Sequence, residues 1–142
     1  MNTLTLAQAD AIVAAALAEA RKRKLAPLAF VVLDAGGHMV AAKREDNAPF
    51  LRFDIACGKA WGCVGLGNSS RELTDRTAKQ PAFFGALASM TGQGILPSPG
   101  GVLVLGTDGS VLGAVGVSGD TGDNDEACAL AGIAAAGLKA KV

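Results

Sequence analysis

Two ionisable residues on one expected helix, Asp54 and Lys59, are the strongest candidates for chemistry in this sequence. A carboxylate can move a proton, and a lysine ammonium can orient the carboxylate of a substrate. Five positions separate them, so they lie about 140° apart around a helix and cannot form the usual surface pair. Each therefore faces a different neighbour. Either they carry a catalytic role, or one of them belongs to a buried structural ion pair.

Arg44 lies at the end of an expected strand and is a candidate for binding a ligand. Its planar guanidinium can hold a carboxylate through two parallel hydrogen bonds. The alternative is an internal ion pair with one of three acids, Glu45, Asp46 or Asp54. The residues alone leave both interpretations open.

The only histidine, His38, follows the glycine pair 36–37 in an expected turn. Histidine is a common ligand of haem iron, so a histidine-ligated haem would use His38 or a residue of another subunit. The alternative is a solvated histidine at the surface of the turn. Met39, Met90 and the cysteines are other possible donors, and the lack of a CxxCH motif excludes covalent haem attachment.

Two glycine-containing segments are further candidates for contact with a ligand. One is the pair Gly100 and Gly101; the other begins with Ser118, Gly119 and Asp120 and joins an expected strand to an expected helix. Free backbone amides at a helix start can hold an anion, and glycine lets a ligand approach the backbone. The acids of this helix start have a simpler explanation in capping and the helix dipole, and they would repel a phosphate. No Walker or dinucleotide-binding motif is present, so nucleotide binding is rejected.

The cysteines and the N-terminus bear on the compartment. Three cysteines without a CxxC pair argue against a disulfide framework and against a metal site, and they are typical of a reducing cytosol. No basic segment followed by an apolar segment opens the chain, and Gln8, Asp10 and Glu19 interrupt the first apolar stretch. We therefore expect a cytoplasmic protein with no association with a membrane.

Charge and composition limit the partners. The 13 basic and 13 acidic residues cancel, which leaves no basic surface for nucleic acid. A net charge near zero favours self-association. The last expected helix is small and apolar on nearly all sides, which predicts burial against a sheet on one side and against a second subunit on the other. We expect a homo-oligomer with a small-molecule site near the subunit interface.

Periodicity, turn signals and a capping box at Thr5 and Gln8 divide the chain into helices and hairpins. The expected helices are 6–24, 50–64, 69–77, 81–90 and 123–139; the expected strands are 29–33, 39–43, 102–105 and 111–118. This order predicts one domain over residues 1–142. Its fold is an α/β (α+β) arrangement in which helices pack on the faces of an antiparallel sheet of four to five strands.

Five ordered blocks of the sequence resemble the GlcG/HbpS family. They are residues 32–40, 44–49, 54–60, 99–102 and 113–119, the last followed by Asp125 and Glu126. The resemblance covers nearly the whole chain. It implies a profilin-like domain that forms homo-oligomers, and it implies haem as a cofactor, because some members of the family bind haem.

Three functions remain in view. The first is a protein that binds haem or another planar ligand with carboxylates, with its site between the glycine-faced helix, the Gly100–Gly101 loop and the turn 118–122. The second is a small isomerase, tautomerase or hydrolase-like enzyme of organic-acid or aromatic catabolism, in which Asp54 or Asp120 moves a proton and Arg44 or Lys59 orients the substrate. The third is a structural partner without a ligand.

Overall fold

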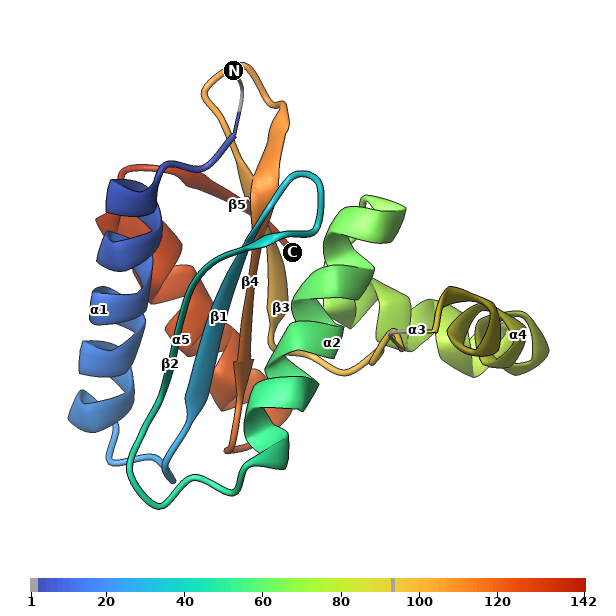
Figure 1. Ribbon diagram of the computed structural model, residues 1–142, viewed down its shortest axis with the longest axis horizontal. Coiled ribbons are helices and arrows are strands. Elements are labelled where there is room, and N and C mark those ends of the chain that lie inside the picture. The colour runs from blue at the N-terminus through green and yellow to red at the C-terminus, as the bar shows by residue number, and fades with distance from the viewer. Residues whose placement is uncertain (1–2, 93) are drawn as a thin grey trace.

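One antiparallel sheet organises the computed structural model, which describes residues 3–92 and 94–142. The strands lie in the order β2-β1-β4-β3-β5 (Figure 1). Their bounds are β1 Ala29–Asp34, β2 Met39–Arg44, β3 Gly101–Leu105, β4 Val111–Ser118 and β5 Lys139–Lys141. Because β1 and β4 each have a neighbour on both sides, apolar residues cover both of their faces.

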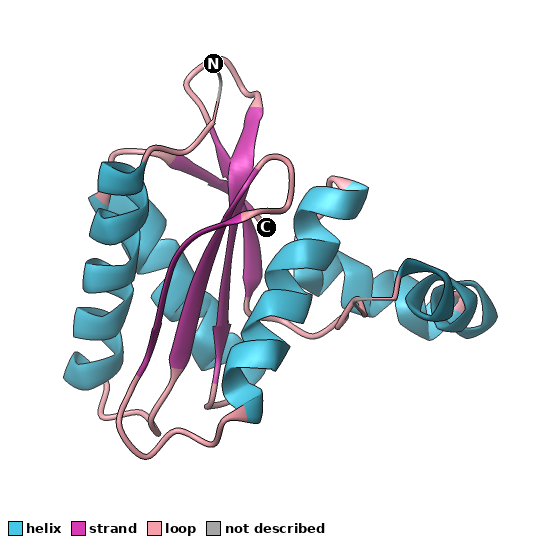
Figure 2. Cartoon of the chain, in the orientation of Figure 1, coloured by secondary structure: helices cyan, strands magenta, loops and turns pink. Residues whose placement is uncertain are grey.

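Helices cover both faces of this sheet (Figure 2). Helices α1 (Leu6–Lys22) and α5 (Gly122–Ala135) pack on one face, and α2 (Leu51–Leu66) packs on the other. Alternation along β1 sends Phe30 and Val32 towards α1 and α5, and Val31 and Leu33 towards α2. The expected α+β fold is confirmed.

Helices α3 (Ser70–Lys79) and α4 (Pro81–Thr91) extend away from the sheet (Figure 1). Both short helices were expected from the sequence. Helix α4 contains no charged residue, yet only Phe84 is buried. Phe83 is 53% exposed and Met90 is 77% exposed. Within the described residues, none of the helices combines the length and the apolar character needed to cross a bilayer.

The predicted start of α1 is confirmed in detail. The backbone N–H of Gln8 donates to Thr5 Oγ1 at 3.1 Å, and the backbone N–H of Thr5 donates to Gln8 Oε1 at 3.0 Å. These two bonds satisfy amides that the first turn of a helix leaves without partners.

The end of the last helix was predicted wrongly. Helix α5 ends at Ala135 rather than near Lys139, and Gly137 adopts a positive φ of 73°. A left-handed glycine after a helix is a common stop signal. The chain then reverses, and β5 pairs with β3. The alanine and glycine content of this segment concealed both features.

Helix α5 packs beside α1 of the same chain on one face of the sheet. A Cβ on Gly132 would lie 2.5 Å from the carbonyl oxygen of Ile12, so only glycine allows the two helices to approach this closely. Part of the small apolar surface of α5 is thus covered within the chain, while Ala134 and Ala135 are exposed. The expected contact of α5 with a second subunit, and with it the homo-oligomer, stays a prediction.

Candidate functional site

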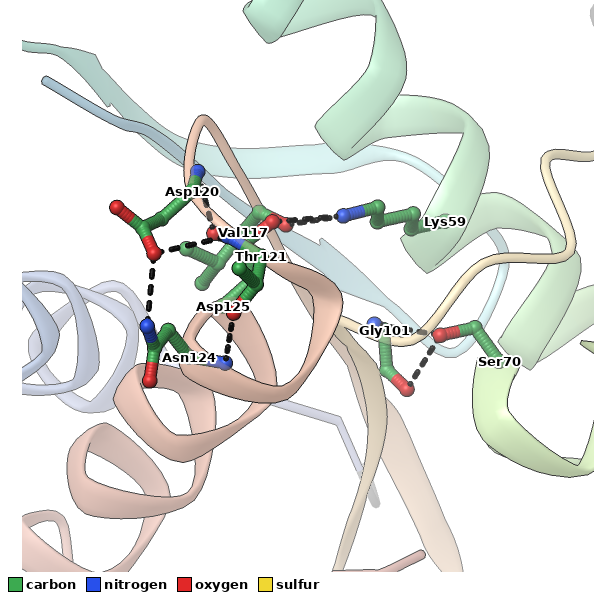
Figure 3. Close-up of polar contacts among 8 residues, drawn as sticks. All are labelled: Lys59, Ser70, Gly101, Val117, Asp120, Thr121, Asn124 and Asp125. Atoms are coloured by element: carbon green, nitrogen blue, oxygen red, sulfur yellow. Dashed lines mark hydrogen bonds and ion pairs between the residues drawn. The ribbon is translucent and has the colours of Figure 1, made fainter. Parts of the chain in front are cut away.

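Lys59 lies in a closed internal network rather than in a cavity (Figure 3). Its side chain comes from α2 and is only 4% exposed. The ammonium Nζ donates to Asp125 Oδ2 at 3.0 Å and to the carbonyl oxygen of Val117 at 2.9 Å. Burial lowers the pKa of Lys59, and the carboxylate of Asp125 opposes that shift. The structural ion pair considered from the sequence is thus present.

The acids at the start of α5 complete this network. Asp125 accepts a second bond from the backbone N–H of Asp120 at 3.0 Å. The carboxylate of Asp120 accepts bonds from Asn124 Nδ2 at 2.7 Å and from the backbone N–H groups of Ala26 and Thr121. These donors, Asn124 first, hold the pKa of Asp120 below its usual range. Asp120 therefore fixes the turn that precedes α5.

Two further acids of α5 bind an arginine. Arg71 Nε, on α3, lies 2.9 Å from Glu126 Oε2, and Arg71 Nη2 pairs with Asp123. These ion pairs attach α3 to the start of α5. Lys59 and Arg71 therefore supply cationic partners from within the chain for three acids of this cluster, Asp123, Asp125 and Glu126.

The predicted glycines lie together, but the chain itself fills the space between them. A Cβ on Gly100 would lie 2.7 Å from Lys59 Nζ, and a Cβ on Gly101 would lie 2.6 Å from the Lys59 carbonyl oxygen. A Cβ on Gly119 would lie 2.5 Å from the Pro27 carbonyl oxygen. Their close approach is to protein atoms, and their contact with a ligand stays a prediction.

Two buried hydroxyls adjoin this network. Ser70 Oγ accepts a bond from the backbone N–H of Gly101 at 2.7 Å and donates to its carbonyl oxygen at 3.1 Å (Figure 3). The hydroxyl of Ser118 is buried, and within the described part of the chain it has no hydrogen-bond partner. We call the set around Lys59, Asp125, Gly100 and Asp120 the Lys59 network.

An open groove lies elsewhere, between the edge strand β2 and helix α2. Its first cavity has a volume of about 350 Å³ and its second about 480 Å³. The first is lined by Leu33, Gly37, Met39, Asp54, Cys57, Gly58, Trp61 and Gly94. The second is lined by Ala42, Lys43, Arg44, Phe50, Phe53 and Asp54. Because Asp54 lines both, we treat them as one β2–α2 groove.

The two halves of this groove differ in chemistry. The first half is lined by Leu33 and Met39, which are paired across the β1–β2 ladder, by Trp61 beside the turn, and by the carboxylate of Asp54. The second half carries Arg44, whereas Lys43 is paired with Phe30, so its side chain projects towards the opposite face of the sheet. Among the described residues Arg44 pairs with no carboxylate; its Nη1 donates to the Ala48 carbonyl oxygen at 2.6 Å. The internal ion pair considered for Arg44 is therefore not formed.

His38 lies beside the groove but outside its lining. Its side chain is 83% exposed, and Nδ1 lies 3.5 Å from Asp34 Oδ1. The backbone N–H groups of His38 and Gly36 both donate to this carboxylate of Asp34. These two bonds, mainly the one from His38, lower the pKa of Asp34. His38 is thus an exposed turn residue whose conformation Asp34 helps to fix.

The three cysteines are free thiols with raised pKa values. Burial is the main cause at each, and it raises the pKa of Cys63 to about 12 and that of Cys128 to about 11. Cys57 lines the groove, and the charge of Asp54 adds to the effect of burial there. Within residues 3–92 and 94–142, no group of three or more His, Cys, Asp or Glu side chains could hold a metal ion.

The structure therefore separates the predicted site residues into two regions. Arg44 and Asp54 line the β2–α2 groove, whereas Lys59, Gly100, Gly101, Ser118, Gly119 and Asp120 lie in or beside the Lys59 network. Sequence reasoning missed Leu33 and Gly94 as lining residues. The alternation of side-chain directions along β2 does not by itself show that Met39 and Arg44 share a face. A bulge opposite Val32 and Leu33 shifts the register and places Met39 on the same side of the sheet as Arg44.

Comparison with known proteins places similar sequences over most of this chain. The family model described as haem degrading protein HbpS-like matches residues 4–134. An uncharacterised 15.0 kDa protein from the dhaT-dhaS intergenic region of Citrobacter freundii is 34% identical over 123 residues, covering 87% of this chain and 84% of that protein.

Solved structures agree. The crystal structure of a PduOC:heme complex matches with a TM-score of 0.86 and 25% identity, covering 99% of both chains. The ORFY protein of Klebsiella pneumoniae matches with a TM-score of 0.84 and 32% identity, covering 94% of this chain and 90% of that one. The sheet and the helices on its faces define an α+β domain with an open groove between the edge strand β2 and helix α2. The chain belongs to the HbpS-like family.

Proposed function

We propose that this chain is a small-molecule-binding protein that holds haem in the β2–α2 groove. The observation that carries the proposal is a groove that combines aromatic and aliphatic side chains with Arg44, a cation that has no carboxylate partner among the described residues. Haem has the matching chemistry, because it is a flat apolar ring with two carboxylates on one edge. When bound, it would supply a redox-active iron.

The groove is suited to such a ligand in size. Small-molecule sites have volumes of roughly 300–1,000 Å³ and mainly apolar walls with a few polar groups. Both halves of the groove fall in this range, at about 350 Å³ and about 480 Å³. Trp61 and Leu33 would contact the ring. The PduOC:heme complex, a structure of the same fold, adds independent support.

The guanidinium of Arg44 would orient the ligand. It uses one nitrogen on the Ala48 carbonyl oxygen, so the other nitrogens remain free to donate to a carboxylate. Asp54 lies between the two halves and repels a carboxylate that is placed the wrong way round. The ring would therefore occupy the Trp61 end and the carboxylates the Arg44 end.

Trp61 is the only tryptophan, so its fluorescence reports directly on the groove. We expect addition of hemin to the purified chain to quench this fluorescence in a saturable way, with a defined stoichiometry and a shifted Soret band. Cys57→Phe places a ring in the cavity and should weaken binding at least about tenfold, which corresponds to about 1.4 kcal/mol.

Met90→Phe is the matched control, because it adds a similar ring at an exposed position of α4. It should leave binding unchanged. Circular dichroism should show that both variants are folded. Quenching that does not saturate, or equal binding by the folded Cys57→Phe and Met90→Phe variants, would show that haem does not bind in this groove.

One observation favours a second candidate function. Asp54 is the only carboxylate among the residues that line the groove, and it lines the same half of the groove as Arg44. A small organic acid held by Arg44 could therefore pass a proton to Asp54, as in an isomerase or tautomerase. Turnover of unsaturated dicarboxylates or lactones, lost in Asp54→Asn while the fold is retained, would support this enzyme. No turnover of either class would reject it.

A further inference from the structure

Three residues near the first cavity carry atoms that can bind haem iron: His38, Met39 and Cys57. The proposal of haem in this groove does not say which of them does so, and the sequence does not select among them. Their positions on the sheet and the helix differ, and these positions separate them.

His38 turns away from the cavity. Leu33 and Met39 are paired in register, and both line the cavity on the α2 side of the sheet. Successive residues of a strand point to opposite faces, so Asp34 projects to the other side. The His38 ring lies beside Asp34, with Nδ1 3.5 Å from the carboxylate, and His38 is not part of the cavity lining.

Cys57 lines the cavity from helix α2. Its side chain has a single rotatable bond, so the sulfur cannot adjust its position to an iron atom. The thiol would also have to lose its proton to bind metal, and burial, followed by the negative charge of Asp54, raises the pKa of Cys57 and opposes that loss.

Met39 meets both conditions. Its side chain belongs to the cavity lining, and a thioether binds iron without losing a proton. It lies at the start of the edge strand β2, whose outer side has no neighbouring strand among the described residues, so the side chain is 48% exposed and can adjust to a ligand. Methionine has three rotatable side-chain bonds and a polarisable sulfur.

We infer that Met39 supplies the protein ligand to the iron of haem bound in the β2–α2 groove. This inference rests on the proposed function. Methionine ligation raises the reduction potential of haem, so the ligand choice has a measurable consequence besides affinity. The bound haem should be held more tightly in its ferrous state than in its ferric state.

The test compares three variants of the full chain, Met39→Leu, His38→Ala and Met90→Leu, loaded with hemin and then reduced with dithionite. Leucine conserves the volume of methionine and removes only the sulfur donor. We expect Met39→Leu to bind ferrous haem at least about tenfold more weakly, with a changed spectrum and a lower reduction potential. Met90→Leu makes the same change at an exposed position of α4, and it and His38→Ala should keep the wild-type spectrum and potential.

A fourth variant, Met39→His, restores a donor at the same position. It should regain ferrous binding with a spectrum typical of histidine ligation and a potential below that of the wild type. If the wild type binds haem and Met39→Leu retains its spectrum and potential, Met39 is not the ligand and the proposed function stands. If His38→Ala alone abolishes the spectrum, His38 is the ligand. If the wild type does not bind haem at all, the proposed function itself fails.

Discussion

The Lys59 network and the β2–α2 groove both take side chains from helix α2, yet the network is closed and the groove is open. In the network, a buried ammonium meets a buried carboxylate, and both are further bonded to the backbone. In the groove, the cation Arg44 has no carboxylate partner among the described residues. The same kinds of side chain therefore serve stability in one region and are available to a ligand in the other.

A charged side chain is available to a ligand only where the chain itself provides no partner for it. A buried ion pair satisfies its own partners, and breaking it leaves an uncompensated charge in a medium of low dielectric constant. An exposed cation costs little to keep and contributes little to stability. Substitutions in the network should thus change the free energy of unfolding, and substitutions in the groove should change binding.

The largest effect is expected from Lys59→Met. It leaves Asp125 buried without its cation, which should lower the free energy of unfolding by about 3–5 kcal/mol. Urea denaturation measures this loss. Lys43→Met is the matched control and should change stability by less than about 0.5 kcal/mol. The double variant Lys59→Met/Asp125→Leu should recover part of the loss; a single variant as stable as the control would contradict the account of the network.

The next effect concerns two glycines with positive φ. Gly100 has φ 128° and lies against Lys59, whereas Gly94 has φ 83° and open space, among the described residues, where its side chain would lie. Both alanine substitutions strain the backbone, at about 1 kcal/mol or more. Gly100→Ala must also displace the network, so we expect its loss of stability to be about twice that of Gly94→Ala by thermal or urea unfolding. Equal losses would show that the loop can shift away from Lys59.

In the groove, Arg44→Met should weaken binding of hemin about tenfold while leaving stability unchanged. Asp54→Asn removes the repulsion of a ligand carboxylate and should strengthen binding a few-fold. Titrations at low and high salt should show that the first effect fades as salt screens the charges. Lys22→Met, on the opposite side of the sheet, is the control. If Arg44→Met binds hemin like this control, Arg44 does not contact the ligand.

The smallest effect is a pH dependence at Asp120. Its pKa is lowered, chiefly by Asn124 and then by two backbone N–H groups. A group with a lowered folded pKa contributes stability above its unfolded pKa and loses that contribution as pH falls through the folded value. The cost of Asp120→Asn should therefore be constant above about pH 5 and shrink below the ordinary value of 3.8. Urea unfolding at several pH values measures it, and a cost that grows on acidification would reverse the assignment.

The sequence predicted most of the fold because the local signals were strong. The capping box at Thr5, the glycine turn before His38 and the short apolar runs of the strands indicated nearly every element. The prediction from sequence was wrong at the end of α5. Alanine and glycine occur on both sides of that boundary, so the hydrophobic periodicity does not show where the helix ends. The pairing of β5 with β3 is a contact over a long sequence distance, which no local pattern contains.

For the site, the residues that carry chemistry can be identified from the sequence, but which of them are free to bind a ligand depends on the tertiary structure. Lys59 and Arg44 both carry one positive charge in the sequence. Folding brings Asp125, 66 positions away, against Lys59 and leaves Arg44 at a sheet edge without a carboxylate among the described residues. Burial and partner choice depend on packing between distant segments, and these set the charge that remains available for a ligand.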